Sequence, residues 1–278
     1  MTVVERANAK VNLVLRVGPP RADGMHPLCS LFAALELADE LTVTPVAGAD
    51  DEVVCPGVVG DNIAAAAAAA FREAVPAAEL PPLRIEIRKR IPVAAGLAGG
   101  SADAAAVLRA ANALAGSPLS LDELRRIAAG LGSDVPSQVE PAHAIVAGVG
   151  ERVERVDLPA MTLVLVPQVQ GLSTAAVYDE LDRLGGHAHD LDRAPLRALA
   201  AGPLGDLATG LANDLQPAAL ALRPQLSDTI GALRAAGAIA AQVTGSGPTA
   251  FGLFSDRAAA ERAAVAIDAP TIVTGLLS

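Results

Sequence analysis

The chain has 278 residues, a hydrophobic content of 52% and a formal net charge of -10 at pH 7. This hydrophobic content predicts a large buried core, divided into two domains or lobes. The acidic balance excludes nucleic acid and anionic membrane as general partners, because both require a positive surface that displaces counterions. No apolar run reaches the roughly 20 residues of a membrane span. The Ala-rich run 63–70 is too short and is followed by Arg72 and Glu73.

The first six residues lack a basic flank followed by an apolar core, so the sequence predicts no signal peptide and a cytoplasmic location. Cys29 and Cys55 are therefore expected to be reduced thiols without a role. Among 21 basic residues only Lys10 and Lys89 are lysines. A lysine within an apolar strand, such as Lys10, suggests a need for a compact ammonium group. Lys89 lies in a run of basic residues that looks exposed.

Alternating residues predict the first strand at 10–17, with Lys10 and Asn12 on one face. Two strands at 28–37 and 41–46 are expected next, joined by a turn at Ala38-Asp39-Glu40. A helix at 62–75, capped by Asp61, and a strand at 83–88 follow.

After residue 92 the pattern mixes helices and strands without a repeat. Ser120 and Glu123 form a capping box at the start of one helix. The stretch 185–210 is weakly patterned and predicts a variable connection. The expected helices are 101–114, 120–131, 173–184, 217–222, 225–236 and 257–267, and the expected strands are 142–146, 161–166, 239–244, 249–254 and 271–277. This order predicts α+β architecture with antiparallel pairing and a boundary near residues 158–161.

The segment 91–106 reads Ile-Pro-Val-Ala-Ala-Gly-Leu-Ala-Gly-Gly-Ser-Ala-Asp-Ala-Ala-Ala, a Gly-rich turn that leads into a helix. Glycine lets the backbone approach a bulky anion, and a helix N-terminus supplies unpaired N–H groups and a positive dipole end. Ser101 either caps this helix or contacts a phosphate. The segment is neither a P-loop nor a dinucleotide fingerprint. Tight packing alone explains such turns as often as a ligand does, but the length and the preceding strand favour phosphate binding.

Two further turns are candidates for the site. Asp134 lies in Leu-Gly-Ser-Asp-Val-Pro (131–136), where Pro136 is expected to hold Val135 extended and so place Asp134 on a defined bend. For a lone Asp, a local Asx turn is as common as catalysis. The turn Val-Thr-Gly-Ser-Gly-Pro-Thr (243–249) either closes over a ligand or is a tight strand connection.

Taken in order, Ala9-Lys10-Val11-Asn12, the loop 92–103, the turn 132–136 and Thr244-Gly-Ser-Gly-Pro248 resemble the GHMP kinase superfamily. Within it, residues 21–26 (Arg-Ala-Asp-Gly-Met-His), 61–62, 99–105 and 131–136 resemble the branch whose substrate is a cytidine-diphosphate-linked polyol. The resemblance covers essentially the whole chain and is loosest at 185–210. It implies an α+β, two-domain GHMP kinase fold, with a mixed β/α domain at 1–158 and a ferredoxin-like α+β domain at 159–278.

The resemblance also implies roles for residues. Asp134 would be the general base, and Lys10 would lie beside it and offset charge on the transferring phosphoryl group. The cofactors would be ATP and Mg²⁺, with no metal ligand assigned to the protein, and the molecule would be a monomer or weak homodimer. The substrate would contact Asn12, Met25, His26 and Tyr178. The triphosphate would be wrapped by Val93, Ala94, Ala95, Gly96, Leu97, Ala98, Gly99, Gly100, Ser101, Ala102 and Asp103.

The chain departs from the family pattern at a few positions. Met25 replaces a usual tyrosine, Ala94 and Ala95 replace common glycines, and Ala102 replaces a common second serine. The other histidines, His143, His187 and His189, match nothing and are expected on the surface. The alternatives are a homoserine- or mevalonate-type kinase and a catalytically silent paralogue, although the presence of Lys10 and Asp134 argues against a silent protein.

Overall fold

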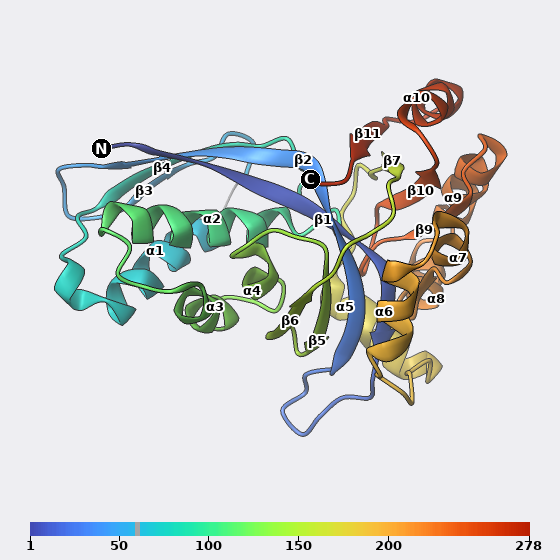
Figure 1. The fold of residues 1–278 in the computed structure, drawn as a ribbon, viewed down its shortest axis with the longest axis horizontal. Coiled ribbons are helices and arrows are strands. Elements are labelled where there is room, and N and C mark those ends of the chain that lie inside the picture. The colour runs from blue at the N-terminus through green and yellow to red at the C-terminus, as the bar shows by residue number, and fades with distance from the viewer. Residues whose placement is uncertain (59–61) are drawn as a thin grey trace. The chain divides into compact units, whose positions relative to one another are not determined.

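In the computed structural model, the described residues are 1–58 and 62–278, and they divide into two compact units (Figure 1). Unit 1 comprises residues 1–9, 37–93 and 98–141, and unit 2 comprises residues 10–36, 94–97 and 142–278. Strands β1 (Val3–Val17) and β2 (Leu28–Pro45) contribute residues to both units. Along the described residues, no helix has the length and apolar character needed to cross a bilayer. The domain boundary at residue 158 stays a prediction.

Unit 1 packs helices against a small sheet. Strand β3 (Glu52–Val54) runs parallel to β4 (Leu83–Arg88), and β4 pairs antiparallel with residues 40–45 of β2. Leu83, Ile85 and Ile87 of β4 are buried, so the alternation of apolar and charged residues predicted this strand correctly. The other elements are α1 (Ile63–Ala74), the 3₁₀ turn η1 (Pro76–Ala78), α2 (Gly99–Leu114), α3 (Leu121–Ala129) and α4 (Val135–Gln138).

The helices of unit 1 follow from small residues and caps. In α1, Ala64, Ala67, Ala68 and Phe71 recur every three to four residues and are all buried, which lets α1 lie close beside α2 (Figure 1). Asn62 caps α1, since its Oδ1 accepts the Ala64 N–H at 2.9 Å. The expected cap, Asp61, lies outside the described residues. The capping box that opens α3 is confirmed.

Unit 2 contains a four-stranded antiparallel sheet of order β11-β7-β10-β9 among the described residues. Its strands are β7 (Thr162–Val166), β9 (Ala240–Val243), β10 (Ala250–Phe254) and β11 (Ile272–Gly275), with helices α5 (Thr174–Leu184), α8 (Gln216–Leu222), α9 (Leu226–Ala235) and α10 (Arg257–Ala266). The first strand of this set pairs with the last, which is the ferredoxin-like arrangement that was expected. Apolar residues of the sheet and these helices form a core that also takes in Leu15 and Val17 of β1.

The remaining elements of unit 2 extend the first two strands. Strand β5 (Ala144–Gly148) pairs antiparallel with residues 28–32 of β2 and with β6 (Arg152–Arg155). The short β8 (Ala212–Asn213) pairs parallel with β1. Helices α6 (Ala194–Ala201) and α7 (Leu204–Thr209) lie within the weakly patterned stretch 185–210, where the sequence predicted a connection and no helix, so both helices were missed.

Three other local predictions are wrong. Strand β2 continues through residues 38–40, because Asp39 is fully buried and accepts the N–H groups of Arg90 (2.5 Å) and Ile91 (2.8 Å) instead of forming a turn. Val135 is the first residue of α4 and is not extended, since Pro136 occupies a first-turn position where its missing N–H costs nothing. The first strand also begins at Val3, well before the expected start.

Candidate functional site

Lys10 is a buried cation in unit 2, with a side chain fixed by its neighbours. Its Nζ donates to Oδ1 of Asn12 at 2.8 Å and lies 4.5 Å from the ring centroid of Phe32. Only 4% of its surface is exposed. The expectation that Lys10 and Asn12 share one face is thus confirmed, and their contact gives the ammonium group a defined position on β1.

Asn12 is held in turn by residues that the sequence did not single out. Its Nδ2 donates to Ser30 Oγ at 2.9 Å, and its backbone N–H donates to Thr244 Oγ1 at 2.9 Å. Thr244 opens the turn 244–248, so this turn is joined to β1 through polar contacts. A buried network of this kind is rigid because each lost bond would leave a desolvated polar group. The network holds the Lys10 ammonium group and the Asn12 amide in defined positions.

The Gly-rich loop ends at a helix that lacks a side-chain cap. Ala98, the N-cap of α2, has a φ of 57°, and no side chain of the described residues caps the helix. The first-turn N–H groups of this 16-residue helix therefore point out of it at the positive end of its dipole. Gly100 lies in this turn, and a Cβ built on it would meet only Ile63, at 3.7 Å. The arrangement suits an anion.

Earlier in the loop, residues 94–97 pack against the turn 244–248 within unit 2. Gly96 has a φ of 75°, and a Cβ there would lie 2.7 Å from the Thr244 carbonyl oxygen. The carbonyl of Leu97 accepts the N–H of Lys10 at 3.2 Å. Ala94 adopts a φ of 52°, a left-handed conformation that glycine would adopt more easily. The loop is thus shaped by close backbone contacts.

Lys89 is not exposed, as its sequence context suggested, but joins two buried carboxylates in unit 1. Its Nζ donates to Asp103 Oδ2 at 2.8 Å and to Asp39 Oδ2. Burial raises the pKa of Asp103 to about 7, with Lys89 opposing this shift and Asp39 adding to it. Burial disfavours the charged form of Lys89, but Asp103 and Asp39 outweigh it and raise the lysine pKa. The Asp103 side chain, predicted to face ATP, is thus already paired.

Asp134 lies at the N-cap position of α4 but does not use its side chain as the cap. Its backbone carbonyl accepts the hydroxyl of Ser137 at 2.8 Å. The local Asx turn weighed as an alternative would use the carboxylate to hold the backbone, and this cap contact is absent from the described α4 terminus. The predicted position beside Lys10 concerns both units and stays a prediction.

His26 and Tyr178, predicted to act together, do meet in unit 2. Their ring centroids are 5.0 Å apart, with an interplanar angle of 50°. Met25 is 47% exposed, and its N–H is held by Asp23 at 3.1 Å. His187 was expected on the surface but stacks on His26, with centroids 5.7 Å apart.

The remaining two histidines differ from each other. His143 was also expected on the surface but is half-buried, and its Nδ1 accepts the Ala34 N–H at 3.1 Å. Burial lowers the pKa of His143. His189 is exposed, as expected.

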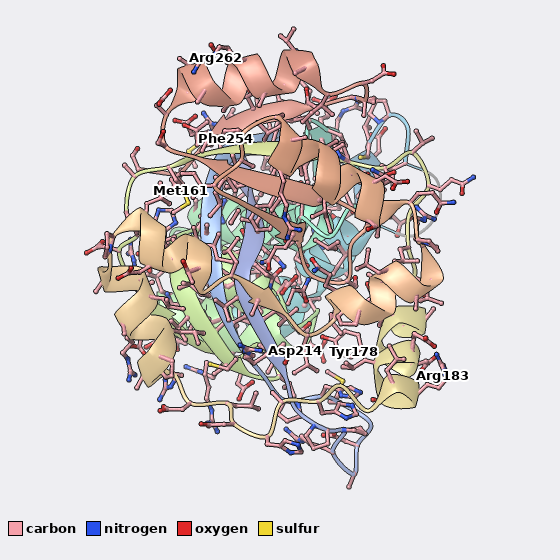
Figure 2. All side chains as sticks on the ribbon, turned by 90° about the vertical axis from the view of Figure 1, so that its right-hand side faces the viewer. Met161, Tyr178, Arg183, Asp214, Phe254 and Arg262 are labelled. Atoms are coloured by element: carbon pink, nitrogen blue, oxygen red, sulfur yellow. The ribbon has the colours of Figure 1, made fainter. Side chains whose placement is uncertain are left out.

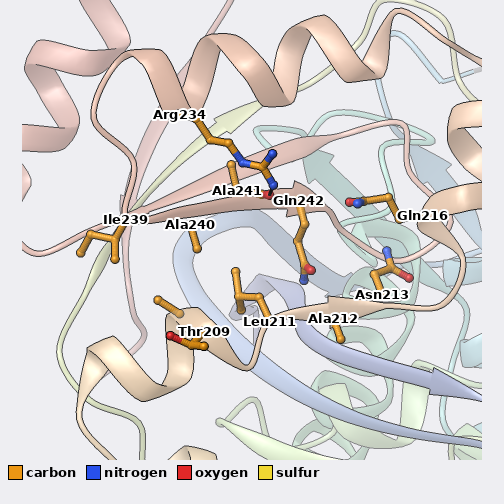
Figure 3. Close-up of a pocket in the computed structure, with 11 residues that line it drawn as sticks. Thr209, Leu211, Ala212, Asn213, Gln216, Arg234, Ile239, Ala240, Ala241 and Gln242 are labelled. Atoms are coloured by element: carbon orange, nitrogen blue, oxygen red, sulfur yellow. Dashed lines mark hydrogen bonds between the residues drawn. The ribbon is translucent and has the colours of Figure 1, made fainter.

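A pocket lies elsewhere in unit 2, between α7, β8 and β9 (Figure 3). Its polar side chains are already used: Gln242 Nε2 donates to the carbonyls of Asn12 and Leu13, and Arg234 donates to the Ala241 carbonyl at 3.2 Å. The predicted site residues are not among its lining residues. The contacts of Gln242 hold β9 against β1. The pocket is therefore not the candidate site.

Comparison with known proteins gives family matches in both halves of the chain. The family model described as "GHMP kinases N terminal domain" matches residues 62–141, and the model "GHMP kinases C terminal" matches residues 195–271. A Streptomyces coelicolor protein named 4-diphosphocytidyl-2-C-methyl-D-erythritol kinase is 46% identical, with 95% of this chain and 92% of that protein covered.

Solved structures agree at the level of the fold. A crystal structure of 4-(cytidine 5'-diphospho)-2C-methyl-D-erythritol kinase superposes with a TM-score of 0.83 at 35% identity, covering 99% of this chain and all of that one. A homoserine kinase from Cytophaga hutchinsonii superposes with a TM-score of 0.71 at 17% identity, covering 99% of this chain and 94% of the other. The second likeness shows a shared fold alone.

Proposed function

The chain belongs to the 4-diphosphocytidyl-2-C-methyl-D-erythritol kinases of the GHMP kinase family, and we propose that it transfers the γ-phosphoryl group of ATP to the 2-hydroxyl of that cytidine-diphosphate-linked polyol. The observation that carries the proposal is the 46% identity along 95% of the chain. The chain is accordingly an ATP-dependent phosphotransferase with an alcohol acceptor, and its reaction serves the non-mevalonate route to isoprenoid precursors.

The uncapped start of α2 supports the assignment of residues 93–103 to the ATP triphosphate. Phosphate oxygens would accept the first-turn N–H groups near Gly99, Gly100 and Ser101, which no side chain of the described residues caps. Positive dipole ends are stabilising for anions placed at that point. The carboxyl of Asp103 is bound by Lys89, so the phosphate contacts would come from the backbone N–H groups of the first turn.

The oxygen donors of the loop fit a magnesium ion held mainly by the nucleotide. Mg²⁺ keeps several waters and usually takes one or two protein oxygens together with substrate phosphates. Among the loop side chains, Ser101 offers a hydroxyl in the first turn of α2, and Asp103 is engaged by Lys89. When bound, the ion would neutralise charge on the β- and γ-phosphates.

Lys10 and Asp134 would carry the chemical step. The ammonium of Lys10 is desolvated and oriented by Asn12 and Phe32, so it can stabilise negative charge on the transferring group without moving. Asp134 would accept the proton of the attacking hydroxyl. Asn12, whose amide is oriented by Ser30, would contact the alcohol near that hydroxyl.

His26 and Tyr178 would hold the cytosine of the substrate. Their rings stand 5.0 Å apart and offer one polar edge and one stacking face. Met25, which replaces the usual tyrosine, would supply a flexible thioether in place of a second stacking face. We also propose a cytoplasmic site of action, and a monomer or weak homodimer as the working form.

A small panel of alcohols tests the function. The purified chain with MgATP is assayed for ADP release on the cytidine-diphosphate-linked substrate, on its methylerythritol phosphate portion without the cytidine, on homoserine and on mevalonate. We expect turnover on the first and little on the others. Preference for homoserine or mevalonate would replace the substrate assignment, and loss of all turnover would support a silent paralogue.

A further inference from the structure

Three side chains with metal-binding atoms converge beside the proposed cytosine pocket. They are His26, from the segment that precedes β2, Asp182 on α5, and His187 just after α5. Their potential ligand atoms all lie within 4.8 Å of one another. Tyr178 lies on α5 (Figure 2), and Asp182 follows it one turn later, so the same helix face presents the ring and the carboxylate.

The local fold builds this cluster from separate segments. Gly185 ends α5 in the left-handed conformation, with a φ of 67°, and reverses the chain so that His187 reaches back to Asp182. The next residue, Ala188, donates its N–H to the Val17 carbonyl at 2.7 Å. Gly18, which follows, accepts a hydrogen bond from His26. The end of β1 therefore ties His26 and His187 to one place.

The hydrogen bond of His26 fixes which ring nitrogen is available. Nδ1 lies 3.0 Å from the carbonyl oxygen of Gly18, and a carbonyl only accepts, so Nδ1 carries the hydrogen. In the neutral ring, Nε2 then bears the lone pair. A histidine ligand that donates its other nitrogen to a backbone carbonyl is the usual arrangement in metal sites, because the second bond orients the ring.

In the neutral ring, the lone pair of His26 Nε2 lies near a carboxylate oxygen of Asp182, and a cation bound between the two atoms would satisfy both. Nε2 lies 3.5 Å from Asp182 Oδ1, longer than the 2.7–2.9 Å of a charge-assisted hydrogen bond. Two ligands of a tetrahedral Zn²⁺ ion, each about 2.0–2.1 Å from the metal, lie about 3.4 Å apart. His187 Nε2 is 2.8 Å from the same oxygen. Asp182 is 40% exposed and is free to open that distance.

We propose that His26, Asp182 and His187 form a binding site for a transition-metal ion of the Zn²⁺ class. Two imidazoles and one carboxylate suit zinc, copper or nickel, whereas Mg²⁺ prefers oxygen ligands alone. Three protein ligands leave a fourth position for water or another ligand. The site is thus chemically distinct from the one that would bind the magnesium of MgATP.

Occupation of this site opposes binding of the nucleobase, an effect that rests on the proposed function of His26 and Tyr178. A metal on His26 Nε2 takes the ring edge that the cytosine would use. Zinc therefore competes with the cytidine portion of the substrate and leaves ATP binding unchanged. The free concentration of transition-metal ion would therefore control inhibition of the enzyme through this site.

The site is tested by direct binding, without an activity assay. Zn²⁺ is titrated calorimetrically into the nucleotide-free chain, and Co²⁺ is used as a spectroscopic probe whose visible absorption reports tetrahedral coordination. Wild type should bind a single ion per chain. His187→Gln should weaken binding by about 10- to 100-fold or more, as loss of metal-site partners does. His189→Gln, two residues away and exposed, is the matched control and should bind as wild type.

The outcomes test the metal site and its competition with cytidine separately. Absence of binding, or equal binding by wild type and His187→Gln, overturns the site. Cytidine, which lacks the phosphates that would themselves chelate zinc, is then titrated with and without Zn²⁺. Weaker cytidine binding in wild type but not in His187→Gln supports competition. Zinc binding that leaves cytidine affinity unchanged retains the metal site and overturns the placement of the base at His26.

Discussion

The two lysines of the chain have opposite roles in the structure, and substitution by methionine should separate them. Lys10→Met removes the ammonium group proposed to stabilise the transferring phosphoryl group, so we expect a loss of most turnover. Asn12 Oδ1 keeps a second donor in Thr244, so the free energy of unfolding should fall by only about 1 kcal/mol. Lys89→Met leaves Asp39 and Asp103 buried without their cation, which should lower the free energy of unfolding by roughly 3 kcal/mol or more.

Steady-state kinetics and urea denaturation measure these two effects. Lys10→Arg should be as slow as Lys10→Met, because a planar guanidinium does not fit the place of a compact ammonium. Near wild-type turnover in either Lys10 variant would remove this residue from the mechanism.

Asp134 gives a second prediction at the scale of one residue. Its side chain does not cap α4, so Asp134→Asn should fold normally. Asparagine cannot accept a proton at neutral pH, and turnover should fall roughly 10²- to 10⁴-fold with little change in either binding constant. Asp122→Asn, which alters an exposed carboxylate on α3, is the control and should be unaffected. Wild-type turnover in Asp134→Asn would exclude a general base here.

Asp103 makes stability depend on pH in a defined direction. Its pKa in the folded chain, about 7, lies above its ordinary value of 3.8. The folded state therefore keeps a proton that the unfolded state releases. The contribution of Asp103 to the free energy of unfolding is lost as the pH rises between these two pKa values. We expect the Asp103→Asn variant to gain stability relative to wild type as pH rises from about 4 to 7. Urea denaturation across this range measures the difference, and a difference that stays constant with pH would contradict the raised pKa.

At the scale of an element, the start of α2 separates phosphate binding from packing. A Cβ at Gly100 would meet only Ile63 at 3.7 Å, whereas one at Gly99 would press on Ile91 at 3.0 Å. Gly100→Ala should therefore leave stability unchanged or raise it by up to about 1 kcal/mol, since alanine is the better helix former. The variant should weaken the binding of ATP, because the added methyl group blocks close approach of the phosphates to the backbone. Binding of the alcohol substrate should be unaffected. Calorimetric titration of each ligand measures these affinities. Unchanged ATP affinity would mean that the turn has a structural role only.

Elements with strong local patterns were predictable from the sequence, and elements built on distant contacts were not. Strand β4 was placed exactly because apolar and charged residues alternate, and α3 because Ser120 and Glu123 form its cap. β8 has two residues and no pattern of its own, since β1 provides its pairing.

The candidate site was predictable to a similar extent. Lys10 with Asn12, and His26 with Tyr178, were paired correctly. The cluster of Lys89, Asp39 and Asp103 joins three separate segments, so no local window shows it. Its one available signal was the scarcity of lysine in the chain.

At the scale of the whole molecule, the shared strands β1 and β2 determine how the chain unfolds. Leu15 and Val17, from the start of the chain, belong to the same core as Val164 and Val177. We therefore expect the fragment 159–278 to remain unfolded alone and to gain structure when co-expressed with 1–158. Far-UV circular dichroism and amide hydrogen exchange of the fragment measure this. A fragment that folds unaided, with protected amides, would show that the later residues form a self-sufficient core.

The same strands decide how parts may be exchanged between relatives. Unit 2 is assembled from residues 10–36, 94–97 and 142–278. A chimera with a single crossover near residue 158 would place Leu15 and Val17 of one parent against β7 and α5 of the other. A chimera that folds must instead take all three segments from the same parent. We therefore expect substrate preference in this family to be inherited with these three segments together, although they are separated along the gene.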